Sequence, residues 1–169
     1  MVPEDSDVRP TKSVVVRAIR DMLRPIIHET VVVDLFAGTG RVGKALLDEG
    51  ARKAIGVDRS DPLEELPVSY NWIKRDVEDF VSEGPGQPVD VVFMDPPYGS
   101  QYPVELLTEL QQVDWLKDRG IIIIETARSF ELPDRIGEED PLYLMRKRNY
   151  GGSRLWLYQF GRSQPGYQE

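Results

Sequence analysis

Short runs of β-branched and apolar residues alternate along this chain with segments whose apolar residues recur at helical spacing. The apolar runs predict strands near residues 31–35, 53–57, 71–75, 89–94 and 120–125. The helical spacing predicts helices near residues 12–24, 41–49, 77–83 and 103–116. Strands without polar alternation are typical of a parallel sheet buried on both faces. We therefore expect an α/β fold with right-handed crossovers and a ligand at the carboxyl edge of the sheet.

Two segments depart from simple alternation. Residues 142–160 form two strand-like runs around Gly151 and Gly152, which predicts an antiparallel hairpin closing the sheet. The segment between the second and third strands is short and contains Pro62 and Pro67, so we expect an irregular loop there instead of a crossover helix. With 169 residues we expect one domain, residues 1–169, whose ends at 1–8 and 163–169 are disordered tails.

The first predicted helix has two different faces. Arg17, Arg20 and Arg24 share one face. An apolar face, which we expect to pack on the sheet, consists of Val15, Ile19, Met22, Leu23 and Ile26.

A short motif ends the fourth predicted strand and suggests chemistry. Asp95, Pro96, Pro97 and Tyr98 follow the apolar run at 89–94. Asp95 can accept a hydrogen bond from a planar amine, and the prolines hold the turn rigid while the Pro96 carbonyl supplies a second acceptor. Tyr98 offers a face on which a base can stack. The motif therefore predicts a grip on the exocyclic amine of a nucleobase, although a rigid strand-to-loop turn would explain it as well.

A glycine-rich turn follows the first predicted strand. Gly38, Gly40 and Gly43 match the spacing of a dinucleotide fingerprint, with Asp58 placed to bind a ribose. Asp34 precedes this turn, and its carboxylate would repel a pyrophosphate but suits a cationic amino group. A ligand with a ribose, an adenine and a cationic amino-acid tail is S-adenosylmethionine. We favour it as the cofactor, with a nicotinamide dinucleotide as the alternative.

A third strand-end carboxylate completes the predicted cofactor site. Asp76 can accept from the adenine amine while the Val77 N–H donates to the ring. Asp76 is equally explained as the cap of the next helix, and the two roles are compatible.

These motifs, in this order, resemble the class I methyltransferases that methylate amines. More narrowly, the chain is similar to the bacterial small-subunit ribosomal RNA guanine-N2 methyltransferase family, in which an Arg-Pro-Thr segment and a helix precede the first strand and a basic hairpin ends the chain. Arg9, Pro10 and Thr11 match that opening. The resemblance implies a Rossmann-like fold with a seven-stranded, mostly parallel sheet.

The resemblance also assigns roles. It implies catalytic residues Asp95, Pro96, Pro97 and Tyr98. It implies cofactor contacts from Asp34, Phe36, Ala37, Gly38, Thr39, Gly40, Asp58, Arg59, Asp76, Val77 and Asp95. It implies substrate contacts from Arg9, Thr11, Tyr98, Arg146 and Arg148. The expected partner is small-subunit ribosomal RNA, free or in an assembling ribosomal particle.

The amino-acid composition limits the possible chemistry, location and partners of the protein. The chain has no cysteine and one histidine, which excludes disulfides and thiolate sites and leads us to expect no metal. It has no long apolar run or signal-like start, so we expect a cytoplasmic protein with no membrane partner. The net charge of −8 opposes nucleic-acid binding, but Arg146, Lys147, Arg148 and Arg154 concentrate positive charge in the final hairpin.

Other functions stay open at this point. An adenine-N6 methyltransferase acting on DNA or RNA would use the same grip on an amine. A glutamine-amide methyltransferase is disfavoured, because that group resembles Asn-Pro-Pro-Tyr where this chain has Asp95. A cofactor-binding module without catalytic activity would also keep the glycine-rich turn.

Overall fold

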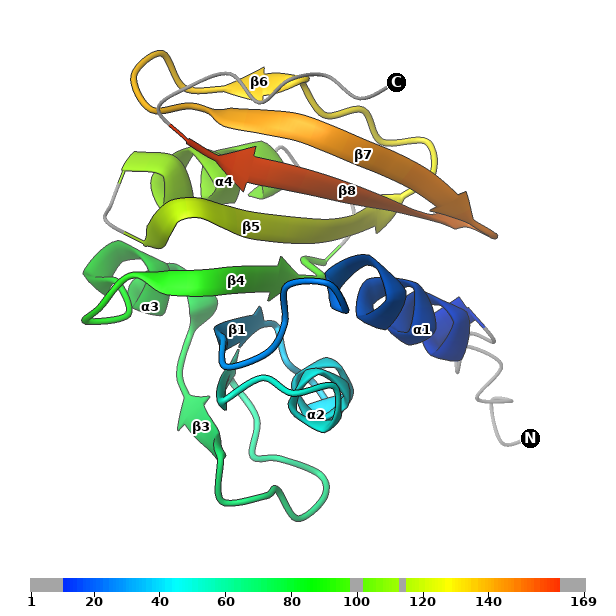
Figure 1. Ribbon diagram of the computed structural model, residues 1–169, viewed down its shortest axis with the longest axis vertical. Coiled ribbons are helices and arrows are strands. Elements are labelled where there is room, and N and C mark those ends of the chain that lie inside the picture. The colour runs from blue at the N-terminus through cyan, green and yellow to red at the C-terminus, as the bar shows by residue number, and fades with distance from the viewer. Residues whose placement is uncertain (1–10, 98–101, 113–114, 162–169) are drawn as a thin grey trace.

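One sheet runs through the whole molecule (Figure 1). The computed structural model describes residues 11–97, 102–112 and 115–161. Its strands are β1 (Val31–Leu35), β2 (Lys53–Asp58), β3 (Tyr70–Lys74), β4 (Val89–Met94), β5 (Leu116–Ala127), β6 (Arg135–Ile136), β7 (Leu142–Tyr150) and β8 (Ser153–Phe160). They lie in the order β3-β2-β1-β4-β5-β8-β7-β6. Strands β1 to β5 pair in parallel, while β7 and β8 form the antiparallel hairpin. The predicted fold is thus confirmed, and the two-residue β6 adds an eighth strand.

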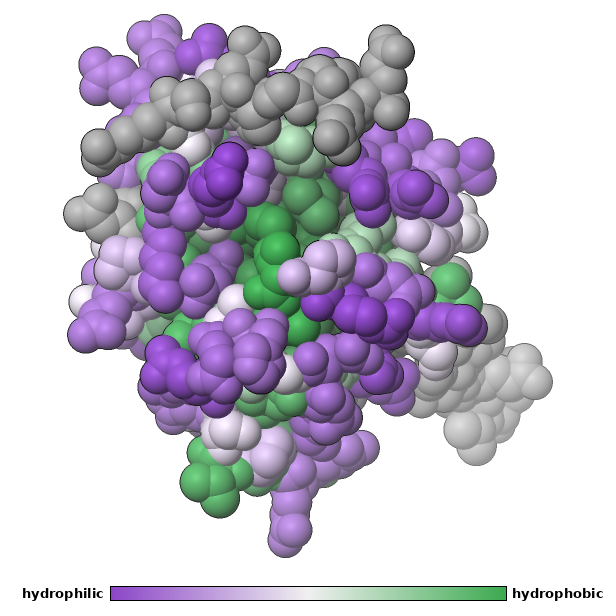
Figure 2. All heavy atoms as spheres, in the orientation of Figure 1, coloured by the Kyte–Doolittle hydropathy of each residue, from purple (hydrophilic) through white to green (hydrophobic). Residues whose placement is uncertain are grey.

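Helices cover both faces of the sheet (Figure 1). They are α1 (Thr11–Leu23), α2 (Arg41–Asp48), α3 (Val77–Glu83) and α4 (Tyr102–Gln112). One apolar cluster joins α1 and α2 to the sheet, and a second joins α3 and α4 to the opposite face. On the α1 face, hydrophobic residues are visible in a central hollow surrounded by hydrophilic ones (Figure 2). None of the helices in the described part of the chain is long and apolar enough to span a membrane.

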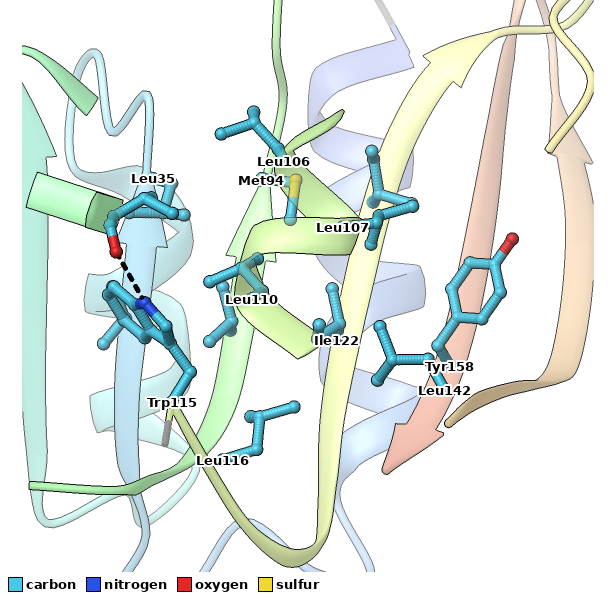
Figure 3. Packing of buried hydrophobic residues seen from close by; sticks show 14 of the residues in the cluster. Leu35, Met94, Leu106, Leu107, Leu110, Trp115, Leu116, Ile122, Leu142 and Tyr158 are labelled. Atoms are coloured by element: carbon cyan, nitrogen blue, oxygen red, sulfur yellow. Dashed lines mark hydrogen bonds between the residues drawn. The ribbon is translucent and has the colours of Figure 1, made fainter. Parts of the chain in front are cut away.

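The core behind the sheet explains where α4 ends. The prediction that this helix reaches residue 116 was wrong, because the helix ends at Gln112 and Leu116 already belongs to β5. Trp115 is fully buried between these elements, and its indole N–H donates to the Val81 carbonyl oxygen at 2.9 Å (Figure 3). Burying this large ring favours an early end to the helix, since the hydrophobic effect scales with the apolar area removed from water.

The apolar face of α1 packs on the sheet with one exception. Val15, Ile19 and Leu23 are buried as predicted. The prediction for Ile26 was wrong, because its side chain is 46% exposed and Ile27 is buried instead. The helix ends at Leu23, so the helical spacing no longer applies to the residues that follow.

Candidate active site

A cavity of about 470 Å³ opens at the carboxyl ends of β1, β2, β4 and β5. A volume of this size suits a ligand as large as a cofactor. Of the predicted site residues, it brings together Asp34, Phe36, Ala37, Gly38, Thr39, Asp58 and Asp95. The remaining lining residues are Val15, Val16, Arg41, Val42, Ser60, Leu63, Phe93 and Glu125. The carboxyl ends of parallel strands meet at one edge, which is why carboxylates distant in sequence share this cavity.

The glycine-rich turn between β1 and α2 is held in an unusual conformation. Phe36, Gly38 and Gly40 all have positive φ, at 60°, 58° and 75°. Such values suit glycine but are uncommon for a phenylalanine, so the surrounding contacts must hold the Phe36 backbone. Asp58 helps to hold this turn, because its Oδ2 accepts from the Gly38 N–H at 2.9 Å and its Oδ1 accepts from the Ser60 N–H at 2.9 Å. Gly40 occupies the N-cap position of α2 but is not among the cavity-lining residues.

Asp34 is the most perturbed acid of the site. Its side chain is 2% exposed on a strand in the middle of the sheet. Burial raises the pKa of Asp34 from 3.8 to about 8, and the negative charges of Asp95 and Asp58 add to this effect. Hydrogen bonds of 3.4 Å from the Gly43 N–H and the Tyr70 hydroxyl oppose the rise in pKa without cancelling it. A buried carboxylate of this kind is poised to ionise when a cation binds.

The third glycine of the fingerprint has a packing role. A Cβ on Gly43 would lie 2.5 Å from the Tyr70 ring, and a Cβ on Gly56 would lie 2.6 Å from the same ring. Tyr70 is therefore seated between α2 and β2 against two glycines, from where its hydroxyl reaches Asp34. Burial and the nearby Asp34 charge raise the pKa of Tyr70, so this hydroxyl stays protonated and donates a hydrogen bond to Asp34.

Asp76, Val77 and Arg59 stay outside the residues that line the cavity. Asp76 occupies the N-cap position of α3, yet its side chain makes no capping hydrogen bond. Its carboxylate pairs with the Arg59 guanidinium instead. The predicted adenine-binding end of the site is thus bordered by an ion pair that links the ends of β2 and β3.

Asp95 lies with the other carboxylates of the cavity, and the two prolines after it differ in exposure. Pro96 is buried and Pro97 is exposed. Tyr98 and Arg9 lie outside the described residues, and so does the side chain of Thr11. Among the described residues, no three His, Cys, Asp or Glu side chains form a group that could hold a metal ion.

The predicted basic residues lie in a different place from the carboxylates. Arg146 and Arg148 line a separate cavity of about 290 Å³ between α1 and β7, together with Arg17 and Asp21. Arg17 also borders a third cavity, of about 540 Å³, that is lined by α1 and by Arg41 of α2. The cavity between α1 and β7 is called the basic groove below, and α1 borders both this groove and the carboxylate cavity.

Two arginines of the α1 stripe have a structural partner. Glu49, at the end of α2, accepts from Arg20 Nη2 at 2.6 Å and from Arg24 Nε at 3.2 Å. These bonds lower the pKa of Glu49 and fasten α1 to α2. Arg20 and Arg24 therefore have a structural role in the contact between α1 and α2, which the sequence pattern could not show.

Sequence reasoning missed Glu125. This residue lies near the end of β5, is 8% exposed, and lines the same cavity as Asp34 and Asp95. The signal was available, because an acidic residue directly after the apolar run at 121–124 is the same feature that identified the other strand-end carboxylates.

Comparison with known proteins decides the family. Residues 1–159 match the family described as "Conserved hypothetical protein 95". The chain belongs to this family. It is 29% identical over 166 residues to a proposed rRNA methyltransferase, YlbH, of Bacillus subtilis, covering 91% of this chain and 89% of the relative. It is also 29% identical over 133 residues to ribosomal RNA small subunit methyltransferase D of Haemophilus influenzae, covering 72% of this chain and 69% of that one.

Solved structures agree with this placement. A proposed methylase from Haemophilus influenzae, HI0767, superposes with a TM-score of 0.71 at 26% identity, covering 90% of this chain and 99% of the other. A proposed methyltransferase from Escherichia coli, yhhF, gives a TM-score of 0.79 at 24% identity over 92% and 88% of the two chains. The family resemblance inferred from the motifs is thereby confirmed.

Proposed function

We propose that this protein is an S-adenosylmethionine-dependent methyltransferase acting on an exocyclic amine, guanine N2 of small-subunit ribosomal RNA. One observation carries the proposal, namely that the Asp34, Asp58 and Asp95 carboxylates, from three strands, share a single cavity beside a glycine-rich turn. The relatives named as ribosomal RNA methyltransferases support the RNA substrate. Family resemblance alone supports guanine N2 over another amine.

The cavity residues fit the proposed cofactor chemically. The buried Asp34 suits the cationic amino group, since a buried charge is tolerated when it is paired. The turn around Gly38 brings backbone close to a ligand, and Asp58 lies where ribose hydroxyls would be held. Phe36 and Leu63 supply apolar wall. Bound there, S-adenosylmethionine would supply an electrophilic methyl group.

The chain's own residues would then activate the amine. The Asp95 carboxylate and the Pro96 carbonyl each accept a hydrogen bond from the exocyclic NH2, which draws the nitrogen lone pair out of conjugation with the ring. The nitrogen would accept the methyl group as the bond from that group to the sulfonium sulfur breaks, which leaves a neutral thioether, and the proton that the nitrogen then loses would pass to Asp95 or to water. Positioning and fixed dipoles supply most of the rate enhancement in such a step. Tyr98, one residue beyond the described part, remains the predicted stacking surface for the base.

The basic groove between α1 and β7 is the proposed track for the RNA backbone. Arg17, Arg146 and Arg148 lie together there, and the same helix, α1, also borders the cavity that contains Asp95. The hairpin concentrates positive charge on a protein of net charge −8. We expect this local field to bind phosphates, with an assembling ribosomal particle as a partner that supplies further contacts. With such a substrate, we expect the protein to act in the cytoplasm.

A methyl-transfer assay tests the proposed function. The full chain is given S-adenosylmethionine labelled on its methyl group and, separately, unmodified small-subunit ribosomal RNA, assembled subunits, DNA and protein. After digestion, label on N2 of a single guanosine is the expected result. Label on adenine N6 would overturn the guanine assignment, and no label in any pool, with cofactor binding intact, would overturn the proposed function as a whole.

A further inference from the structure

Glu125 occupies a defined place along the edge of the sheet. From the strand order, the strand-end carboxylates follow one another as Asp58 at the end of β2, Asp34 on β1, Asp95 after β4 and Glu125 on β5. The register pairs Met94 with Ile124, which places Asp95, just past β4, next to Glu125 on the adjacent β5. Glu125 is thus on the side of Asp95 away from the proposed ribose and amino-acid contacts.

The alternation of the strands aims Glu125 at the same cavity as Asp95. Ile121 and Ile123 pack in the cluster on the α1 face, and Phe93 on β4 packs there as well. Glu125 is two residues beyond Ile123, and Asp95 is two residues beyond Phe93, so both continue on that face. Both also line the cavity, and Glu125 is 8% exposed. A carboxylate that lines a ligand cavity can accept a hydrogen bond from a donor on the ligand.

Guanine has such a donor next to its reactive amine. Its N1–H lies beside the N2 amine on the Watson–Crick edge, whereas adenine has a bare N1 lone pair beside its N6 amine. A second carboxylate beside the one that holds the amine would therefore accept from guanine and repel adenine. We propose that Glu125 accepts the N1–H of the target guanine and is the residue that selects guanine over adenine. This inference rests on the proposed function and deepens it.

Substitution at Glu125 tests the inference. The methylated guanosine is first located with the wild-type protein, and two further RNAs are prepared with adenosine or N1-methylguanosine at that position. For Glu125→Gln we expect kcat/KM on the guanosine RNA to fall about tenfold, since a hydrogen bond to a charged acceptor is replaced by one to a neutral amide. The amide can also donate to adenine N1, so the preference for guanosine over adenosine should narrow. Glu125→Asp keeps the charge and should retain more of that preference.

Two controls separate the possible failures. Glu131→Gln removes an acidic side chain that is 70% exposed on the loop after β5, and its preference should equal that of the wild type. The affinity of Glu125→Gln for S-adenosylhomocysteine should also be unchanged, because the cofactor contacts lie on the other side of Asp95.

The wild-type protein provides a test that needs no folded variant. It should methylate the N1-methylguanosine RNA at least tenfold more slowly than the guanosine RNA. Equal rates on those two RNAs, or an unchanged guanosine preference in Glu125→Gln, would overturn the role of Glu125 while leaving the proposed function intact. Absence of any guanosine methylation by the wild-type protein would instead overturn the proposed function.

Discussion

The buried Asp34 makes cofactor binding depend on pH in a way that can be calculated. Its pKa of about 8 means that the free protein keeps Asp34 mostly protonated at pH 7. A cationic amino group bound beside it favours the carboxylate, so binding must expel one proton. Between pH 6 and pH 7 the ionised fraction of a group with this pKa rises about ninefold, and affinity for a cation should rise by nearly the same factor, about 1.3 kcal/mol.

Calorimetry with S-adenosylhomocysteine measures this coupling directly, because that ligand carries the amino group and undergoes no transfer. Titrations at pH 6 and 7, each in two buffers of different ionisation enthalpy, give the affinity and the number of protons released. We expect nearly one proton released at both pH values. Asp34→Asn has the same shape and cannot titrate, so its affinity should be nearly constant over this range. Methylthioadenosine, which lacks the amino-acid tail, should also bind the wild type without pH dependence.

The same titration affects stability. Because the folded pKa of Asp34 is raised above 3.8, the folded state holds more protons than the unfolded state between about pH 4 and pH 8. The free energy of unfolding should therefore fall as the pH rises through this window, by up to roughly 1.4 kcal/mol per pH unit from this group. Asp34→Asn should lose that slope. Equal affinity of the wild type at pH 6 and pH 7, with no proton released, would refute the reasoning from burial to cofactor binding.

Three further changes test other parts of the structure. Asp95→Ala should lower kcat by roughly 100-fold or more, as for loss of a preorganised electrostatic contact, while cofactor affinity measured by calorimetry stays near that of the wild type. Gly43→Ala should lower the free energy of unfolding in urea by about 1–3 kcal/mol, because the new methyl group would collide with the Tyr70 ring at 2.5 Å. The Arg146→Ala, Arg148→Ala double variant should bind RNA more weakly at 0.1 M salt and with a salt dependence reduced by roughly one phosphate contact per arginine.

The glycine and arginine changes each have a matched control, and all three predictions have an outcome that would contradict them. Gly152→Ala adds a methyl group where no atom lies within 4 Å, so it should leave stability nearly unchanged. Arg52→Ala with Lys53→Ala removes two charges at the amino end of β2, on the opposite edge of the sheet, and should spare RNA binding. Turnover by Asp95→Ala near the wild-type rate would contradict the amine-holding role. Equal stability of the two glycine variants would contradict the packing argument, and an unchanged salt dependence would move the RNA track elsewhere.

The sequence predicted the architecture well, because burial on both faces leaves a strong pattern. β1 and β4 begin and end where their apolar runs do, at Val31–Leu35 and Val89–Met94. The errors fall at the ends of two helices. Ile26 is exposed because α1 ends at Leu23, so the helical spacing does not continue to it. The end of α4 follows from the burial of Trp115, whose partner Val81 is distant in the sequence and cannot be found from local periodicity.

Some charged residues of the site could also be located from the sequence, whereas others needed the structure. Strand-end carboxylates can be located because topology alone brings them to one edge, and Glu125, directly after the apolar run of β5, has the same feature. The arginines of α1 needed three-dimensional information, since only the structure places Glu49 against Arg20 and Arg24. The glycines of the fingerprint also have different roles, which their spacing does not reveal. Gly38 lines the cavity, whereas Gly43 leaves space for the Tyr70 ring.

The short connection between β2 and β3 bears on whether this protein is catalytic. A missing crossover helix would be a reason to suspect a degenerate module if it left the cavity without a wall. The described segment instead contributes Leu63 to the cavity, and its polar groups bind to α2 and β3. Trp72 Nε1 donates to the Ser60 carbonyl at 2.9 Å, and Lys44 pairs with Glu64 at 2.7 Å.

Two aromatic side chains of β3 pack against the glycine-rich turn. Tyr70 and Trp72 lie 6.2 Å apart between ring centroids, and both approach the position of a Cβ on Gly40. The Tyr70 hydroxyl also donates a hydrogen bond to Asp34, so a residue that packs on the turn also holds the proposed cofactor-binding carboxylate. The shortened segment therefore preserves both the wall of the cavity and the setting of its central acid, which removes the main reason to favour a module without catalysis.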